Sequence, residues 1–115
     1  SAQQLTLNIK VKRHDKFAAL FMDLEGALDR LNAHELINRI KEAAEKARMD
    51  IIVNFEHLKL AAPDALKTLV DSDAIKAAVP HVKVRYRKFR DAFENSVQGL
   101  SLAGLEMLIE DSQDA

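Results

Sequence analysis

The sequence contains no cysteine, and it has only three glycines and two prolines among 115 residues. The lack of cysteine excludes disulfide bonds, thiolate catalysis and thiolate zinc sites. The chain also lacks a glycine-rich loop of the kind that holds phosphate groups. These absences remove several large classes of enzyme and metalloprotein from consideration.

The chain has no excess of charge of one sign. Its 17 Lys and Arg residues nearly balance its 18 Asp and Glu residues, leaving a net charge of -1. Overall charge therefore gives no reason to expect binding to nucleic acid or to acidic membranes. No segment approaches the roughly 18 to 20 apolar residues of a membrane span, and the N-terminus lacks the pattern of a signal peptide. We expect a cytoplasmic protein that is not inserted in a membrane.

The length and the hydrophobic content favour one domain. With 115 residues and 48% hydrophobic side chains, the chain is large enough to bury a core without a metal or a disulfide. We expect residues 1–115 to form one domain whose acidic tail, residues 110–115, is frayed. Because the chain begins with Ser1, it is also consistent with a domain from a longer protein.

The central feature of the sequence is the segment from residue 50 to residue 70. The run from Ile51 to Phe55 is apolar except for Asn54, which predicts a strand buried on both faces. A loop carrying Leu58 and Leu60 is expected next. Pro63 then suits the first position of a helix. A loop after the carboxyl end of a buried strand is where α/β folds usually place function.

Two further strands and a helix are predicted before this segment. Apolar and polar residues alternate over residues 5–11, and a more apolar run follows over residues 17–24; together they predict an antiparallel hairpin. Gly26 is expected to end the second strand. Asn32 and Glu35 are spaced as a capping box, and the apolar positions that follow predict a helix to Ala47.

The C-terminal third predicts another strand and two helical pieces. The helix after Pro63 either continues to Ala78 or breaks near residues 71–73. Alternation over residues 82–87 predicts a strand with a basic face. Apolar spacing predicts a helix over residues 89–97 and a short apolar element over residues 102–109. The order ββαβαβα gives an α/β fold with a mixed central sheet of about four strands, helices packed against it, and right-handed parallel crossovers.

Three stretches resemble the STAS family, the domain of anti-sigma factor antagonists that also occurs in sulfate transporters and lipid-transport and stress-signalling complexes. LEGALDRLNAHEL, from Leu24 to Leu36, is similar to the family's strand-turn-helix signature. IIVNFEHLKLAAPDALKTLV, residues 51–70, is similar to its strand, functional loop and helix. LAGLEMLIED, residues 102–111, is similar to its C-terminal Leu-x-Gly-Leu pattern. The resemblance implies a single STAS-like domain.

The chain departs from the family at the functional loop. Regulated members carry Asp-Ser-Ser-Gly-Leu, with a serine that a partner kinase phosphorylates, where this chain has Ala62, Pro63, Asp64, Ala65 and Leu66. Asp64 falls on the second serine, the phosphosite equivalent. The resemblance implies either a fixed charge that imitates phosphoserine or a member that never used the switch. A carboxylate carries about one charge, whereas a phosphoserine carries roughly 1.5 to 2.

The resemblance implies a non-catalytic regulatory module that binds a protein. That partner is an anti-sigma factor or kinase-like protein or, alternatively, a component of a transporter or multi-domain complex. Self-association through the loop leucines is a further option. Asp64 has a structural explanation as well, because an acid in the first turn of a helix interacts favourably with the helix dipole. The predicted partner-binding residues are Glu56, His57, Leu58, Leu60, Pro63, Asp64 and Lys67.

No catalytic, metal or cofactor site is predicted. His34 and Glu35 are not followed by a second histidine at helical metal spacing, and no serine lies in a nucleophile motif. A small-ligand or enzymatic site at Glu56 and His57 is the least favoured alternative.

A row of basic residues remains to be explained. Lys83, Arg85 and Arg87 alternate along one predicted strand. Such a row either protects a solvated sheet edge or docks an acidic partner. Nucleic acid is a weaker candidate, because Tyr86 alone offers little stacking surface.

Overall fold

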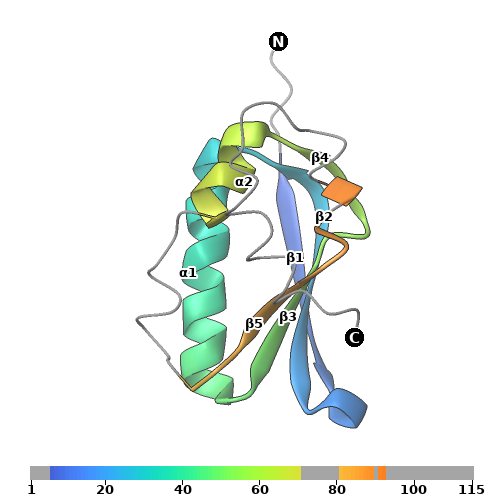
Figure 1. The fold of residues 1–115 in the computed structure, drawn as a ribbon, viewed down its shortest axis with the longest axis vertical. Coiled ribbons are helices and arrows are strands. Elements are labelled where there is room, and N and C mark those ends of the chain that lie inside the picture. The colour runs from blue at the N-terminus through green and yellow to red at the C-terminus, as the bar shows by residue number, and fades with distance from the viewer. Residues whose placement is uncertain (1–5, 71–80, 90, 93–115) are drawn as a thin grey trace.

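The computed structural model describes residues 6–70, 81–89 and 91–92. Their elements follow the chain in the order shown in Figure 1. They are β1 (Leu7–His14), a 3-10 turn η1 (Asp15–Phe17), β2 (Ala19–Leu28), α1 (Arg30–Ala47), β3 (Asp50–Asn54), β4 (Leu58–Ala61), α2 (Pro63–Val70) and β5 (Val84–Arg87).

These strands form one mixed sheet in the order β1-β2-β3-β5, with β4 also paired to β2. β1 and β2 are antiparallel, as the predicted hairpin requires. β2 with β3, β2 with β4 and β3 with β5 are all parallel. The predicted α/β class with a mixed sheet is confirmed, and the sheet has five strands within the described residues, where about four were expected.

Helices α1 and α2 lie on the same face of the sheet (Figure 1). The path from β2 to β3 to β5 moves across the sheet in one direction, and right-handed crossovers then place both connecting helices on one side. The main core fills the space between these helices and the sheet. Its buried members are Met22, Leu24, Leu28, Ala33, Leu36, Ile37, Ile40, Ala44, Ile51, Val53, Phe55, Ala61, Ala65, Leu69, Tyr86 and Phe89.

Strand β3 is the most buried strand of the sheet. Every residue from Ile51 to Asn54 is at most 5% exposed, so the prediction of a strand buried on both faces is confirmed. A cluster of aromatic rings closes the core at the carboxyl end of β3. The ring of Phe55 lies 5.2 Å from that of Phe89 in an edge-on arrangement and 6.1 Å from that of Tyr86. This cluster holds the end of β5 against the end of β3.

The prediction that Gly26 ends the second strand is wrong. Strand β2 begins at Ala19, after the 3-10 turn, and continues past Gly26 to Leu28. Gly26 has a φ of 92°, and a Cβ atom there would lie 2.3 Å from the carbonyl oxygen of Thr6. The pairing of β2 with β4 shifts register between Gly26 and Ala27. Glycine therefore marks an irregularity within the strand, where the backbones approach closely.

The predicted capping box was placed three residues too late. Helix α1 begins at Arg30 and its N-cap is Asp29. The Asp29 side chain accepts from the Asn32 backbone N–H at 2.7 Å, and the Asn32 side chain accepts from the Asp29 N–H at 2.7 Å. Asn32 is thus the third helical residue of the box and not its cap. The helix ends before Arg48, whose φ of 49° is left-handed.

The expected loop carrying Leu58 and Leu60 is strand β4, so that prediction is also wrong. β2 extends beyond the end of β3, and its residues Gly26 to Leu28 leave an edge with which residues 58–61 pair. The described part of α2 ends at Val70. Several predictions lie outside the described residues: the extension of that helix or its break at 71–73, the helix beyond residue 92, the element over residues 102–109, and the tail.

Candidate functional site

The candidate site is built on the turn that joins β3 to β4. β3 ends at Asn54, and the backbone N–H of Leu58 donates to the carbonyl of Phe55 at 3.2 Å to close the turn. Glu56 and His57 form the tip of this turn and are exposed. The turn lies at the carboxyl ends of the parallel strands, the position where the sequence predicted function.

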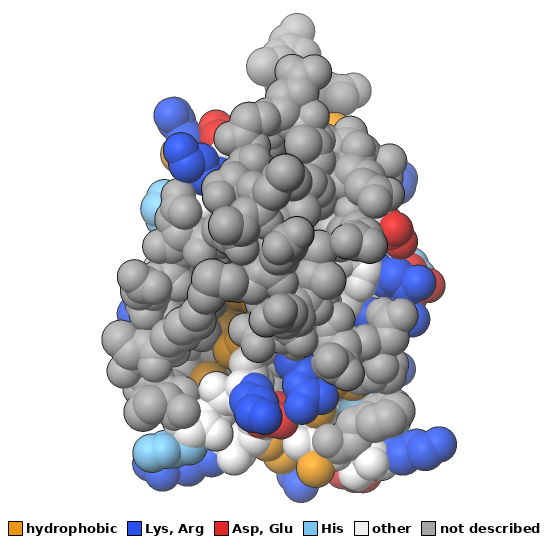
Figure 2. Space-filling view, in the orientation of Figure 1, with side chains coloured by type: hydrophobic (Ala, Val, Ile, Leu, Met, Phe, Trp, Pro, Cys, Tyr) orange, Lys and Arg blue, Asp and Glu red, His pale blue; other side chains and the backbone are white. Residues whose placement is uncertain are grey.

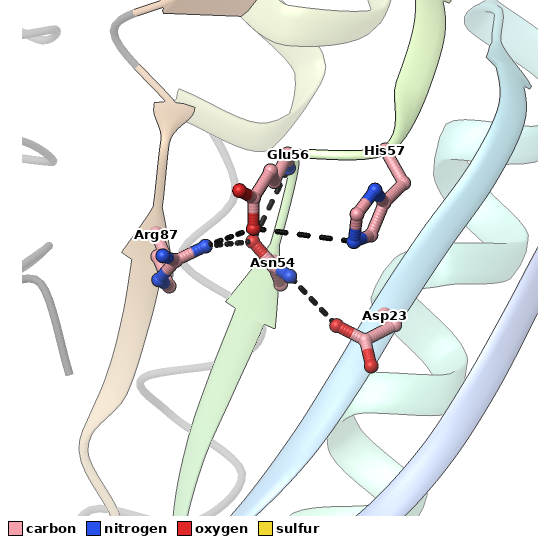
Figure 3. A network of polar contacts seen from close by, with 5 residues as sticks. All are labelled: Asp23, Asn54, Glu56, His57 and Arg87. Carbon is pink, nitrogen blue, oxygen red and sulfur yellow. Dashed lines mark hydrogen bonds and ion pairs between the residues drawn. The ribbon is translucent and has the colours of Figure 1, made fainter.

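Asn54 joins three neighbouring strands at this end of the sheet (Figure 3). Register places Asp23 of β2 and Arg87 of β5 directly beside it on either side. Its side-chain amide donates to the Asp23 carboxylate at 2.7 Å, and its amide oxygen accepts from Arg87 Nη1 at 3.1 Å. The same oxygen accepts from the backbone N–H of Glu56 at 3.2 Å. Asn54 is 5% exposed, and these bonds satisfy its buried side chain.

The Arg87 side chain also fixes the tip of the turn. Its Nη1 atom lies 2.6 Å from Glu56 Oε2. The hydrogen bond and the charge of Arg87 lower the pKa of the Glu56 carboxyl below its usual value. His57 Nε2 lies farther away, 3.9 Å from the same carboxylate oxygen. Glu56 is therefore held ionised and attached to β5, while His57 remains at the exposed end of the turn.

The two leucines of β4 have different environments. Leu58 is half-buried and packs against the core, whereas Leu60 is 54% exposed. Strand β4 has only four residues and pairs with β2 on one side. Leu60 therefore belongs to a short strand at the surface. One leucine therefore supports the fold and the other is free to contact a partner.

Helix α2 continues this surface. It begins at Pro63, as predicted, and Asp64 lies in its first turn. Asp64 and Lys67 are both exposed, whereas Ala65 is 0% and Leu69 is 2% exposed. The apolar side of the helix thus faces the core and the charged side faces outward.

The three basic residues near β5 do not form one continuous exposed row. Lys83 is exposed but precedes the strand, and its backbone N–H donates to Asp50 Oδ1 at 3.1 Å. Arg85 is half-buried, and Arg87 is occupied by Asn54 and Glu56. On the face that Figure 2 shows, blue Lys and Arg side chains lie in the lower middle and around the margin, with red acidic side chains among them.

The structure brings together Glu56, His57 and Arg87, which the sequence had assigned to two separate features. It places Leu60, Asp64 and Lys67 on β4 and α2 beyond the turn. Sequence reasoning missed the roles of Asp23 and Asn54, although a polar residue inside an apolar strand indicates that partners must be found. Within the described residues, no group of three potential metal ligands is present, and no helix is long and apolar enough to cross a membrane.

Comparisons with known proteins show a STAS-like fold. No protein-family profile and no curated protein matches the sequence. An anti-sigma factor antagonist STAS domain from Rhodobacter sphaeroides has a TM-score of 0.56 and 12% identity, over 79% of this chain and 96% of that one. Unphosphorylated SpoIIAA, an anti-sigma factor antagonist, has a TM-score of 0.51 and 16% identity, over 90% of this chain and 96% of that one. A Mycobacterium paratuberculosis antagonist has a TM-score of 0.50 and 14% identity, over 90% and 95%.

Proposed function

We propose that this STAS-like domain is a non-catalytic module that binds a partner protein. The contact is made by the turn after β3, by β4 and by α2 as far as Lys67, which we call the α2 entry surface. Its exposed members are Glu56, His57, Leu60, Asp64 and Lys67, and its segment also includes Leu58, which packs against the core, and Pro63, which begins α2. An anti-sigma factor or a kinase-like protein is the first candidate partner, and a subunit of a transporter or multi-domain complex is the alternative.

The exposure of Leu60 is the observation that carries this proposal. A leucine that is 54% exposed lies on a short strand just before the exposed Asp64 and Lys67. Protein interfaces commonly have an apolar centre and a polar rim. Here Leu60 supplies the apolar centre, and the two charges supply part of the rim. The bonds from Asn54 and Arg87 hold the preceding turn in place, so little order has to be gained on binding.

Asp64 supplies a permanent negative charge to the α2 entry surface. In the STAS resemblance it lies where regulated members carry a phosphorylated serine. We infer that phosphorylation does not switch binding at this position, because an aspartate has no hydroxyl to modify. The same carboxylate also stabilises the start of α2 by about 0.3 to 1 kcal/mol through the helix dipole. The two roles are separable, since one affects stability and the other affects binding.

The pKa of Glu56 argues against the enzymatic alternative at the turn. A general base works best with a pKa near the operating pH, whereas Arg87 lowers the pKa of Glu56. The carboxylate is thereby made a weaker base. Its role in this proposal is to shape the turn through the ion pair with Arg87.

A pull-down with matched variants tests the proposal. The tagged chain, Leu60→Ser and Asp64→Asn are used as baits in lysate of the source cells, and each bait's melting temperature is recorded. Leu31→Ser is the control, because Leu31 is exposed at 76% but lies on α1, outside the α2 entry surface. We expect a protein that the parent and Leu31→Ser capture and that Leu60→Ser loses while remaining folded. Equal capture by all folded baits would contradict the proposal.

A further inference from the structure

Among the strands that the structure describes, β1 is at an outer edge of the sheet. Among the described strands it pairs with β2 alone. The two strands pair without a register shift over eight residues of β1, from Leu7 to His14. The sequence of β1 contains no proline. Four consecutive residues, from Lys10 to Arg13, are exposed. β1 therefore lacks the bulges and prolines that often close a sheet edge to further strands.

In an antiparallel hairpin, the backbone N–H and C=O groups of alternate residues point toward the partner strand, and those of the other residues point away from it. One hydrogen bond identifies which residues of β1 point away from β2. The N–H of Ala27 donates to the carbonyl of Thr6 at 2.9 Å, so these opposed residues are a hydrogen-bonded pair. Such pairs alternate with non-bonded ones along an antiparallel ladder. Residues 8, 10 and 12 therefore direct their backbone groups toward β2. Ile9 and Val11 direct theirs to the open edge, together with Leu7 and Arg13.

The two sides of β1 differ in chemistry. Leu7 and Ile9 pack beside the core, and Val11, on the same side by alternation, is 47% exposed. Lys10 and Lys12 lie on the opposite side, and both are exposed. The Lys10 ammonium contacts Glu25 at 3.1 Å, yet its side chain remains 68% exposed. The open edge therefore offers apolar contact on one side and positive charge on the other.

This charge favours an acidic partner strand over a second copy of the chain. If two copies paired their β1 strands in antiparallel fashion about Val11, Lys10 of each copy would face Lys12 of the other. Like charges directly opposite one another destabilise a strand pair, whereas opposite charges stabilise it. The strand also carries Arg13 and no acidic residue. The lysines thus act against self-pairing and in favour of a strand with carboxylates at alternate positions.

We propose that the outer edge of β1 binds an extended acidic segment of a partner protein by strand addition. Main-chain bonds form with the outward groups of residues 7–13, as in other cases of strand addition. Apolar side chains of the segment pack beside Ile9 and Val11, and its Asp or Glu side chains lie beside Lys10 and Lys12. This edge and the α2 entry surface lie on opposite sides of β2, because Gly26 of β2 pairs with Leu7 of β1 on one side and with Leu58 of β4 on the other.

The first test uses a defined probe in place of the unknown partner. A fluorescent eight-residue peptide of alternating valine and glutamate is titrated into the chain, and the same peptide with lysine for glutamate is the control. We expect the acidic peptide to bind and its saturation to slow amide hydrogen exchange at Ile9 and Val11. Equal binding of both peptides, or binding without this protection, would overturn the proposal. Protection at these amides that rises with the concentration of the free chain would indicate self-pairing instead and would also overturn it.

Substitutions separate strand addition from other modes of binding. Val11→Pro removes an outward N–H at a position where an edge strand tolerates proline, and Val11→Ser keeps that N–H. We expect Val11→Pro to weaken binding about three- to tenfold relative to Val11→Ser, the range for one lost hydrogen bond. Lys12→Glu, which changes only an exposed side chain, should weaken the acidic peptide about two- to tenfold and improve binding of the lysine peptide. Unchanged affinities in folded Lys12→Glu protein would refute the charge argument.

Discussion

Replacing Asn54 by alanine should destabilise the domain strongly, because this side chain joins β2, β3 and β5. It donates to Asp23 at 2.7 Å and accepts from Arg87 at 3.1 Å, and a third bond goes to the backbone of Glu56. Hydrogen bonds to charged groups contribute about 1.5 to 3 kcal/mol each. Asp23 is half-buried and Arg87 is 22% exposed, so water replaces part of what is lost. We expect a loss of about 2 to 4 kcal/mol in the free energy of unfolding.

Urea unfolding and thermal melts measure this effect. For a chain of 115 residues, the usual entropy of unfolding converts this loss to a fall in melting temperature of about 8 to 17 °C. His57→Ala is the matched control, because His57 lies at the same turn but its side chain is 60% exposed. That variant should change stability by no more than about 0.5 kcal/mol.

A double-mutant cycle tests whether the bonds act as one network. Asp23→Ala and Asn54→Ala remove the two ends of one hydrogen bond, so their combined effect should be smaller than the sum of the single effects. The reasoning would be refuted if Asn54→Ala were as mild as His57→Ala. It would also be refuted if the effects of the two alanine substitutions were simply additive.

Three other predictions follow from single positions. Gly26→Ala should cost about 1 to 3 kcal/mol in urea unfolding, because φ is positive and the new Cβ meets the Thr6 carbonyl; a neutral effect would contradict the close approach. Arg87 lowers the pKa of Glu56 in the folded state, so this stabilisation is complete above the pKa of an unfolded glutamate and is lost as pH falls through the lower folded-state pKa. Glu56→Gln should therefore reduce the loss of stability at acidic pH, measured by urea unfolding at a series of pH values. An unchanged dependence of stability on pH would show that the ion pair does not cause this loss. Asp64→Asn should lower stability by only about 0.3 to 1 kcal/mol in thermal melts, and a larger loss would indicate a structural role that the geometry does not explain.

The strands with clear periodicity could be predicted from the sequence. Alternation over residues 5–11 and the apolar run over residues 17–24 predicted the hairpin of β1 and β2, and the apolar run from Ile51 predicted the buried β3. These patterns reflect which faces of a strand are dry. Pro63 identified the start of α2 for a local reason as well, since proline suits the first turn of a helix. In each case the physical cause lies within a few residues of the signal.

The features that sequence analysis missed depend on residues distant along the chain. β4 has four residues, and it is a strand because β2 extends past β3 and offers an edge. Gly26 was interpreted as a strand end because glycine commonly interrupts a strand pattern. The reason for glycine at this position is the nearby carbonyl of Thr6, which lies twenty residues earlier in the chain. The pairing of Asn54 with Asp23 and Arg87 follows from parallel register across three strands. A local pattern can indicate a hairpin of consecutive strands, but it does not show which strands distant along the chain lie side by side.

The measurement that tests the central claim most directly is the mapping of a captured partner onto the domain by NMR. The partner is titrated into the isotope-labelled chain, and changes in backbone amide signals are recorded. The α2 entry surface predicts that the largest changes cluster at Glu56 to Leu60 and at Asp64 to Lys67, and that Leu60→Ser weakens the same titration. Changes confined to residues outside this surface, with Leu60→Ser binding as tightly as the parent, would contradict the account.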